Sequence, residues 1–273
     1  MIEKLQIGSY NVVAGPCFEL KYSDDAMGVV LLNTPSFFET TFKKWIQAKQ
    51  KPEESVDELA KRFPSGPISA YFKEKFDQLK EVFDNSELVV THDFDLLPNR
   101  RPKILMRACG QVAGATFFYH PPEEAIGTAG TALLAKVSAS SHLSYNFFGG
   151  ILECAHMCSY LSLKSLGLNV HRAQLQKRSG VALHPKYGGY FAYRGVFVFP
   201  NVRLPSTFKE KRAAMLLDTV EKQEEAIALY NHHWWDGKYR DCGNPVEKYS
   251  DLQLQYFSTL PEQRWPIIAH WFQ

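Results

Sequence analysis

The sequence predicts an α+β fold in which an antiparallel or mixed sheet packs against helices. Strand-like apolar runs and stretches of helical spacing neither alternate strictly along the chain nor separate into two halves, which disfavours a regular parallel sheet. Hydrophobic residues make up 45% of the 273 residues and aromatic residues 14%, so the chain can bury a sizeable core. This composition also excludes disorder for most of the length.

The first half of the chain contains five predicted elements. A Val- and Leu-rich run is typical of a buried strand, and the sequence Asn33-Thr34-Pro35-Ser36 after it is typical of a helix start. Apolar residues recur at helical spacing after Pro67, with Lys and Glu between them, which indicates an amphipathic helix. The predicted elements are a strand over 28–32, a helix over 37–47, an amphipathic helix over 68–83, a strand over 88–91 and a helix over 103–114.

The second half begins with a segment of different composition. Residues 121–176 are low in charge and rich in Ala, Ser, Gly and Leu. Beyond them, Lys186-Tyr187-Gly188-Gly189 has the composition of a hairpin turn. The predicted elements are two strands over 180–185 and 190–200 that this turn joins, a long helix over 208–230, and two short helical stretches in the tail after 231.

Charge and cysteine content restrict the class of protein. Lys and Arg number 31 against 29 Asp and Glu, and a net charge of +2 disfavours a nucleic-acid partner. The sequence has neither a basic leader followed by an apolar stretch nor an apolar run of about 20 residues, so we expect no secretory signal and no membrane partner. The five cysteines are odd in number and scattered, which predicts reduced thiols and a cytoplasmic location.

The common catalytic motifs are absent. The sequence has no phosphate-binding loop, dinucleotide fingerprint, nucleophile elbow or zinc-protease motif. Cys154 and Cys158 lie near His142 and His156, but their spacing is loose for zinc and no second ligand pair follows, so we favour a surface or partly buried segment over a metal site. The adjacent pair His232–His233 points in two directions on any regular element, which again favours core and surface roles.

Cationic side chains leave two alternatives open. Arg100-Arg101-Pro102-Lys103 forms either an anion site at a helix start or a solvated charge run. Arg194 lies inside an apolar strand, and a buried guanidinium needs a partner. Arg240 and Arg264 lie beside aromatic or acidic residues. Arg194 is either a paired structural arginine or a clamp for a carboxylate-bearing ligand.

Four blocks of sequence resemble one family. LPNRRPKILMRACGQVAGATFFYH (97–120), SGVALHPKYGGYFAYRGVFVFP (179–200) and HWWDGKYRDCGNPVEKYSDLQLQYFSTLPEQR (233–264) resemble the cytosolic cobalamin-processing family of the type C disorder, and LLNTPSFF (31–38) fits its N-terminal strand-to-helix turn. These blocks keep the order of the family and span most of the chain apart from about 121–176.

The resemblance implies a fold similar to flavin-dependent nitroreductases, with an antiparallel sheet flanked by helices and a smaller accessory sheet. It implies a single cobalamin-processing domain over 1–273 with an atypical insertion at about 121–176. That insertion is either a lid or dimer-contact loop over the pocket, or a stretch of little function. In the second case it could be a translated intron.

The resemblance also implies an activity without a catalytic side chain in the protein. The family binds cobalamin base-off, removes cyanide reductively and transfers the alkyl group of alkylcobalamins to glutathione, whose thiolate is the nucleophile. Cobalamin, glutathione and FMN or FAD are therefore the expected cofactors, and a cobalamin-trafficking adaptor homologous to the type D disorder protein is the expected downstream partner of a monomer or weak homodimer. The alternatives are a non-enzymatic cobalamin chaperone and a flavin-dependent reductase acting on another substrate.

The family's binding residues carry over to matching positions of this sequence. The resemblance assigns glutathione to Arg194, Arg240 and Arg264, and it assigns cobalamin to Asp93, Ile104, Leu105, Met106, Arg107, Phe118, Tyr119, His120, Ser179 and Tyr193. Four positions depart from the family pattern: Gln111 stands for a histidine, His120 and Arg107 each stand for an amide, and Gly237 stands for a tryptophan.

Overall fold

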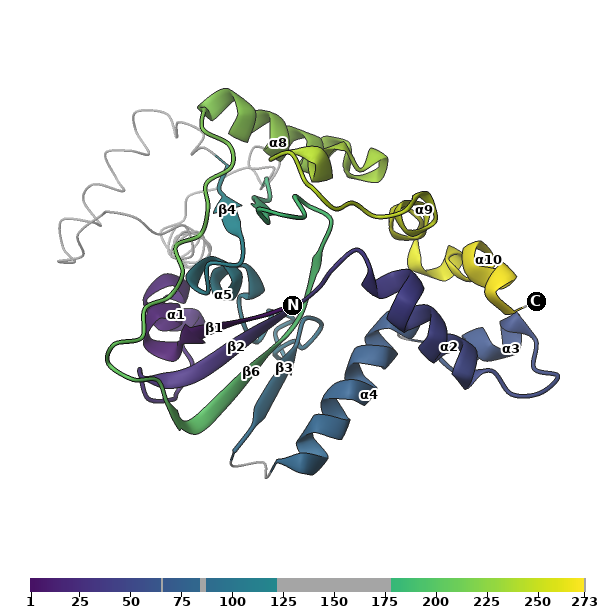
Figure 1. The fold of residues 1–273 in the computed structure, drawn as a ribbon, viewed down its shortest axis with the longest axis horizontal. Helices are drawn as coiled ribbons and strands as arrows, with labels where there is room; N and C mark the ends of the chain where they lie inside the picture. Colours follow the sequence, from purple (N-terminus) through teal and green to yellow (C-terminus); the bar gives the residue numbers. More distant parts are fainter. Residues whose placement is uncertain (65, 84–86, 122–177, 273) are drawn as a thin grey trace, which may run out of the picture.

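A four-stranded antiparallel sheet forms the centre of the fold (Figure 1). The computed structural model describes residues 1–64, 66–83, 87–121 and 178–272. The strand order is β1 (Ile2–Gln6), β2 (Ala26–Asn33), β6 (Ala192–Arg203) and β3 (Val89–His92), and every pair of neighbours is antiparallel. The predicted antiparallel sheet is therefore confirmed, and β1 is a strand that the sequence did not reveal.

A separate two-stranded sheet consists of β4 (Phe117–Tyr119) and β5 (Val181–Leu183). The predicted hairpin between 180–185 and 190–200 is wrong, because β5 pairs with β4 while β6 pairs with β2 and β3. The turn at 184–188 is held by its own ends, since His184 and Gly188 exchange two backbone hydrogen bonds of 2.9 and 2.8 Å. Gly188 adopts φ +52°, which carries the chain out of the accessory sheet and into the central one.

Two cores cover the two faces of the central sheet. Val30 and Leu32 point to the face covered by α1 (Ile7–Ala14) and α5 (Met106–Val112). Val29 points to the opposite face, where α4 (Pro67–Val82) packs together with the helices near the C-terminus (Figure 1). This alternation follows from the two-residue period of a strand, and it explains why β2 reads as a continuous apolar run.

The remaining helices are short and lie mostly around the second core. The predicted helix over 37–47 is confirmed as a π-helical turn followed by α2. The bounds of the remaining helices and helical turns are Pro16–Phe18 (3₁₀), Phe38–Phe42 (π), α2 Lys43–Lys49, α3 Val56–Lys61, α8 Val220–His232, Trp234–Asp236 (3₁₀), Lys238–Asp241 (3₁₀), α9 Asp251–Ser258, Pro261–Gln263 (3₁₀), α10 Trp265–Ile268 and Ala269–Phe272 (3₁₀).

The helix predicted over 208–230 is wrong in its first half. The helix begins at Val220, where the Thr219 side chain accepts a hydrogen bond from the backbone N–H of Lys222. Upstream of this cap, the backbone N–H groups of Leu216 and Leu217 donate to the hydroxyl of Tyr119 at 2.7 and 2.9 Å. Their hydrogen-bonding partner therefore lies in another element, and the segment stays non-helical.

Cysteine and metal expectations have mixed outcomes. Cys109 and Cys242 carry free thiols as expected, whereas Cys17 is disulfide-bonded, which contradicts the expectation for that residue. Within the described ranges no three His, Cys, Asp or Glu side chains group closely enough to hold a metal ion. The candidate cluster at 142–158 lies outside those ranges.

Among the residues that the structure describes, no helix has the length and hydropathy that a bilayer crossing requires.

Candidate functional site

Arg194 occupies a β-bulge in the central strand β6. Leu31 pairs with Gly195 and Leu32 pairs with Tyr193, so Arg194 is the extra residue of β6 opposite β2. A bulge re-aims the side chain of its unpaired residue and is common beside functional sites. The Arg194 side chain is buried, with 8% of the residue exposed.

Both neighbouring strands contribute a partner for the Arg194 guanidinium. Nε donates to Oδ1 of Asn33, the last residue of β2, at 2.8 Å. Nη1 lies 3.4 Å from Oδ2 of Asp93, which follows β3 directly. Burial lowers the pKa of Arg194 and raises the pKa of Asp93, and in each case this outweighs the attraction between the two charges. Asp93 therefore compensates the buried cation incompletely.

Arg240 and Arg264 are anchored by backbone carbonyls and lie against aromatic rings. Nη1 of Arg240 donates to the carbonyl of Gly189 at 2.7 Å, and its guanidinium lies 4.8 and 5.2 Å from the ring centroids of Tyr239 and Tyr249. Nε of Arg264 donates to the carbonyl of Thr259 at 2.9 Å. The Arg264 guanidinium lies 5.2 and 5.8 Å from the ring centroids of Tyr256 and Phe257, so cation–π attraction helps to hold both cations.

The three arginines meet around Tyr249, Tyr256 and Phe257, which we call the aromatic bridge. Phe257 lies 5.4 Å from each of the two tyrosine rings. Burial raises the pKa of Tyr249, opposed by the charges of Arg240 and Arg194, and it raises the pKa of Tyr256 to about 12, opposed by Arg264 and Arg194. The charge of Arg194 thus acts on both tyrosines, and Arg240 and Arg264 each lie against one of them.

A second group of the expected residues forms on the accessory sheet. Phe118 and His120 lie on one face of β4 with ring centroids 4.4 Å apart, and the guanidinium of Arg107 lies 5.1 Å from the centroid of Phe118. Tyr193 joins this group because its hydroxyl lies against Gly110, one turn after Arg107 in α5, where it pairs with the hydroxyl of Thr116 at 2.6 Å. The structure therefore brings four of the residues assigned to cobalamin close together.

Tyr119 points to the other face of β4. Its side chain packs with Val181, Leu183 and Ile227 beneath α8, and only 2% of the residue is exposed. Its hydroxyl already accepts hydrogen bonds from two backbone N–H groups. The side chain of Tyr119 therefore does not line the surface formed by Phe118 and His120.

The other expected cobalamin residues mostly have structural contacts. Ile104 is buried in the core beneath α5, and Met106 packs against the same core. The backbone N–H of Leu105 donates to the hydroxyl of Tyr10 at 3.1 Å, just before α5 begins. Ser179 is exposed, and its backbone exchanges two hydrogen bonds of 2.8 Å with the side chain of Asn231.

Comparison with known proteins identifies the family. A family model described as "Methylmalonic aciduria and homocystinuria type C family" matches residues 1–148 and 152–268. The chain belongs to this family. The matched stretches include most of 121–176, the segment expected to be an insertion.

Relatives of the type C family match nearly the whole chain. A protein of Caenorhabditis elegans named MMACHC-like protein is 33% identical over 97% of this chain and 86% of its own length. Proteins named cyanocobalamin reductase / alkylcobalamin dealkylase are 30% identical in Gallus gallus (98% of this chain, 90% of that protein) and 26% identical in Homo sapiens (97% and 74%). The crystal structure of a C. elegans B12-trafficking protein, CblC, has a TM-score of 0.75 at 31% identity and covers all of this chain and 90% of that one.

Two of the departures from the type C family pattern have clear structural roles. The side-chain oxygen of Gln111 accepts a hydrogen bond from the backbone N–H of Phe118 at 2.6 Å, so this amide ties β4 to α5. Gly237 adopts φ +73°, and a Cβ atom there would lie 2.9 Å from Cδ1 of Leu254. A side chain of any size is therefore strained at position 237.

Asn33 and the aromatic bridge are not predicted by the sequence. The pattern around Asn33 predicts a helix start, and the one signal for another role is its place at the end of a strand. Of the two alternatives for the basic cluster at 100–103, the structure disfavours an anion site at a helix start, because α5 begins only at Met106 and Arg101 lies against the ring of Phe18.

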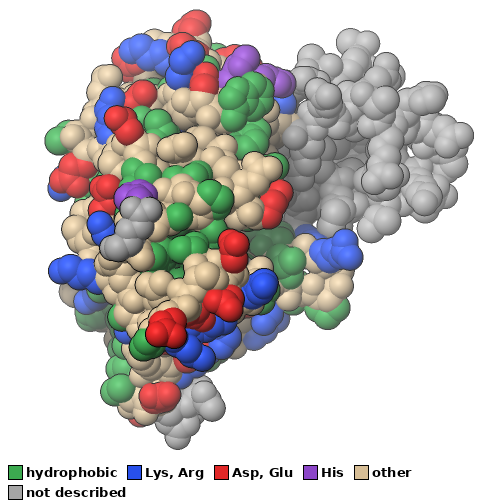
Figure 2. All heavy atoms as spheres, turned by 90° about the vertical axis from the view of Figure 1, so that its right-hand side faces the viewer, with side chains coloured by type: hydrophobic (Ala, Val, Ile, Leu, Met, Phe, Trp, Pro, Cys, Tyr) green, Lys and Arg blue, Asp and Glu red, His purple; other side chains and the backbone are tan. Residues whose placement is uncertain are grey.

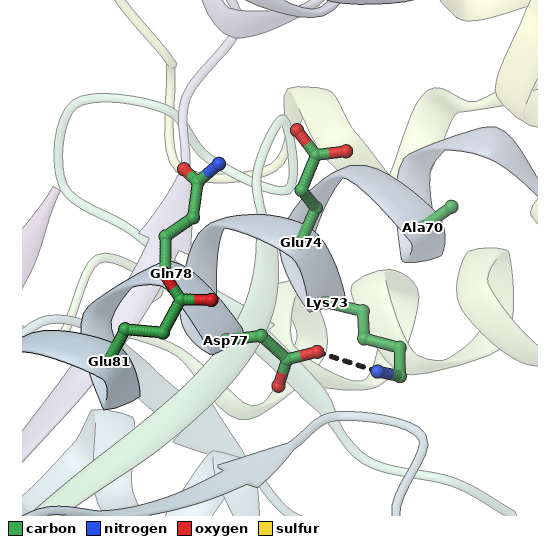
Figure 3. Close-up of a pocket in the computed structure, with 6 residues that line it drawn as sticks. All are labelled: Ala70, Lys73, Glu74, Asp77, Gln78 and Glu81. Atoms are coloured by element: carbon green, nitrogen blue, oxygen red, sulfur yellow. Dashed lines mark hydrogen bonds and ion pairs between the residues drawn. The ribbon is translucent and has the colours of Figure 1, made fainter.

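Two surface features lie apart from these groups. Figure 2 shows hydrophobic side chains gathered in the middle of the face that carries the C-terminal helices, with charged side chains around its lower margin. A shallow hollow runs along the outer side of α4 (Figure 3), where Lys73 and Asp77 form an ion pair of 2.6 Å. This hollow is lined by one solvated helix face, and the helix turns Phe72 and Phe76 the other way, toward the sheet.

Proposed function

We propose that the protein processes cobalamin: it binds the substrate base-off and removes the upper ligand. The two reactions are glutathione-dependent dealkylation of alkylcobalamins and reductive decyanation of cyanocobalamin. The observation that carries the proposal is that Arg240 and Arg264 lie against the aromatic bridge while the charge of Arg194 acts on its two tyrosines, in a chain whose relatives are named for these two activities.

The arginine group fits glutathione by charge. Glutathione carries two carboxylates, and guanidinium groups hold carboxylates through paired, charge-assisted hydrogen bonds. Three partly compensated cations also create a positive potential, which favours the thiolate over the thiol of a bound cosubstrate. The protein then supplies orientation and electrostatics, and the nucleophile belongs to the cosubstrate.

Both reactions balance without a nucleophilic side chain. In dealkylation the thiolate sulfur attacks the alkyl carbon, a sulfur–carbon bond forms, and the cobalt–carbon bond breaks with its electron pair left on cobalt. In decyanation, electrons from a reduced flavin or a thiol reduce cobalt, and cyanide leaves with its own pair. We propose FMN or FAD as the electron donor for the second reaction only.

The accessory-sheet group fits a large, flat ligand. Arg107, Phe118, His120 and Tyr193 offer a cation, aromatic surface and polar edges side by side. We propose that these side chains contact cobalamin, and that Tyr119 contributes through its backbone alone. By family resemblance we also propose a nitroreductase-like sheet arrangement, a cytoplasmic location and a downstream adaptor protein that accepts the product.

Absorbance spectroscopy tests the proposal directly. Methylcobalamin mixed with the protein should shift to the base-off spectrum, and added glutathione should convert it to the reduced or hydroxo form. No spectral change on mixing refutes cobalamin binding. A base-off shift without thiol-dependent conversion leaves a cobalamin chaperone, and flavin oxidation without any cobalamin response leaves a reductase for another substrate.

The Arg194→Gln variant locates the cosubstrate. We expect this variant to raise the KM for glutathione by about tenfold or more, since it removes a charge-assisted contact of at least 1.4 kcal/mol. Base-off binding should remain, because Arg194 lies outside the group on the accessory sheet. Unchanged thiol-dependent turnover would remove Arg194 from the site.

A further inference from the structure

Asn33 combines a short hydrogen bond with an unsatisfied donor in the interior. The residue is 4% exposed at the end of β2, and its Oδ1 accepts from Nε of the bulged Arg194 at 2.8 Å. Its Nδ2 is also buried, and within the described part of the chain it has no hydrogen-bond partner. An unpaired buried amide is unfavourable, so its presence in a native core calls for an explanation.

We propose that Asn33 is a positioning residue that orients Arg194 while leaving its positive charge available to a carboxylate of the thiol cosubstrate. The inference rests on the proposed glutathione-dependent function. It assigns a role to a residue that the family resemblance did not place in the site.

The neutrality of the amide is the reason for an asparagine at this position. An aspartate would accept the same hydrogen bond from Arg194 and would leave no orphan donor. It would also place a second carboxylate on a guanidinium that already faces Asp93. Two carboxylates would saturate the cation, and the incoming ligand would meet a neutral or negative group.

Aromatic rings and one carboxylate surround the Arg194 guanidinium. The ring centroid of Phe72 in α4 lies 5.1 Å from it, and Tyr249, just before α9, and Tyr256 in α9 lie within reach of its charge. Asp93 is the one carboxylate that contacts Arg194 among the described residues, and its 3.4 Å separation exceeds the 2.7–2.9 Å of a strong charge-assisted bond. Nε and Nη1 of Arg194 make the contacts with Asn33 and Asp93, so the carboxylate of the cosubstrate would meet Nη2.

The test adds a charge at position 33 and measures binding of a non-reactive ligand. S-methylglutathione keeps both carboxylates and lacks the thiol, so calorimetry reports its Kd without turnover. We expect Asn33→Asp to weaken its binding by about tenfold, the size of one lost charge-assisted contact. The wild type should bind the diethyl ester of S-methylglutathione far more weakly than the acid, and Asn33→Asp should lose this discrimination.

Matched variants separate orientation from charge and from folding. Gln78→Glu makes the same amide-to-carboxylate change on the outer side of α4 (Figure 3) and should leave the Kd unchanged. Asn33→Ser keeps a neutral acceptor and should stay within about threefold of the wild type, whereas Asn33→Ala should not. The Ser and Ala pair decides the matter if Asn33→Asp does not fold.

The outcomes distinguish this inference from the proposed function. Wild-type protein that binds no S-methylglutathione refutes both. Wild-type binding with an unchanged Kd and unchanged acid-to-ester discrimination in Asn33→Asp overturns the role of Asn33 and leaves the proposed function standing. A base-off spectrum of methylcobalamin in every variant shows that the effect is confined to the cosubstrate.

Discussion

Removing the hydroxyl of Tyr119 should destabilise the fold without altering the ligand surface. The Tyr119→Phe substitution preserves the ring, which packs beneath α8 with Val181, Leu183 and Ile227. It deletes the single acceptor that serves the backbone N–H groups of Leu216 and Leu217. The variant therefore tests whether this expected cobalamin residue acts through its side chain.

The magnitude follows from the burial of the two donors. Leu217 is 5% exposed, so its N–H has little access to water once the hydroxyl is gone, whereas the donor of Leu216 is only partly buried. A buried donor without a partner costs about 1–3 kcal/mol, and a half-buried one costs less. We expect a loss of about 2–3 kcal/mol in the free energy of unfolding.

Urea denaturation followed by circular dichroism measures this loss. Tyr71→Phe is the matched control, because among the described residues the Tyr71 hydroxyl has no hydrogen-bond partner, and this change should stay within about 0.5 kcal/mol. The base-off spectrum of bound methylcobalamin should be the same in both variants. A change below about 0.5 kcal/mol in Tyr119→Phe, or a loss of cobalamin binding in the folded variant, would refute the reasoning.

Two further predictions concern pH and backbone strain. Burial lowers the pKa of His184 from 6.5 to about 4, so the unfolded chain binds more protons between these values, and stability should fall as the pH drops through that window by up to about 3 kcal/mol. His184→Asn should flatten the dependence of the urea midpoint on pH between 7 and 4.5, and an unchanged slope would contradict the assignment. Gly237→Ala should lower the free energy of unfolding by about 1–2 kcal/mol, because the left-handed backbone and the contact with Leu254 both oppose a Cβ. Gly66→Ala is the control, because Gly66 has a similar φ of +85° and open space around the added Cβ. An equal loss in the free energy of unfolding in the two variants would show that the Leu254 contact contributes nothing.

Local patterns in the sequence predicted the elements that are stabilised mainly by burying apolar side chains, whatever apolar surface they pack against. The amphipathic spacing after Pro67 found α4, and the apolar run at 28–32 found β2, because burial against any core satisfies such patterns. Arg194 could be singled out because a cation inside an apolar strand is unusual. Its bulge could not, since the bulge is a property of the pairing between β6 and β2.

Errors occurred where a polar group found its partner far along the chain. The segment at 208–218 has helical composition, but Leu216 and Leu217 donate to a hydroxyl nearly a hundred residues earlier. Asn33 has the composition of a helix cap, yet its oxygen binds Arg194, 161 positions away. Such contacts depend on the assembled fold, and no window of neighbouring residues contains them.

The proposed chemistry requires the two groups of site residues to meet, and one residue connects them. Tyr193 and Arg194 are neighbours on β6, but Tyr193 packs with the core beneath α5, while Arg194 lies over Phe72 in the opposite core. The link between them is Tyr239: the charge of Arg107 acts on its hydroxyl, and its ring lies 4.8 Å from the guanidinium of Arg240. Phe257 in turn packs against both cores and so spans the end of the sheet. If the proposed thiol transfer follows this connection, a substitution that separates Tyr239 from Arg107 or Arg240 should impair thiol transfer more than the binding of either partner.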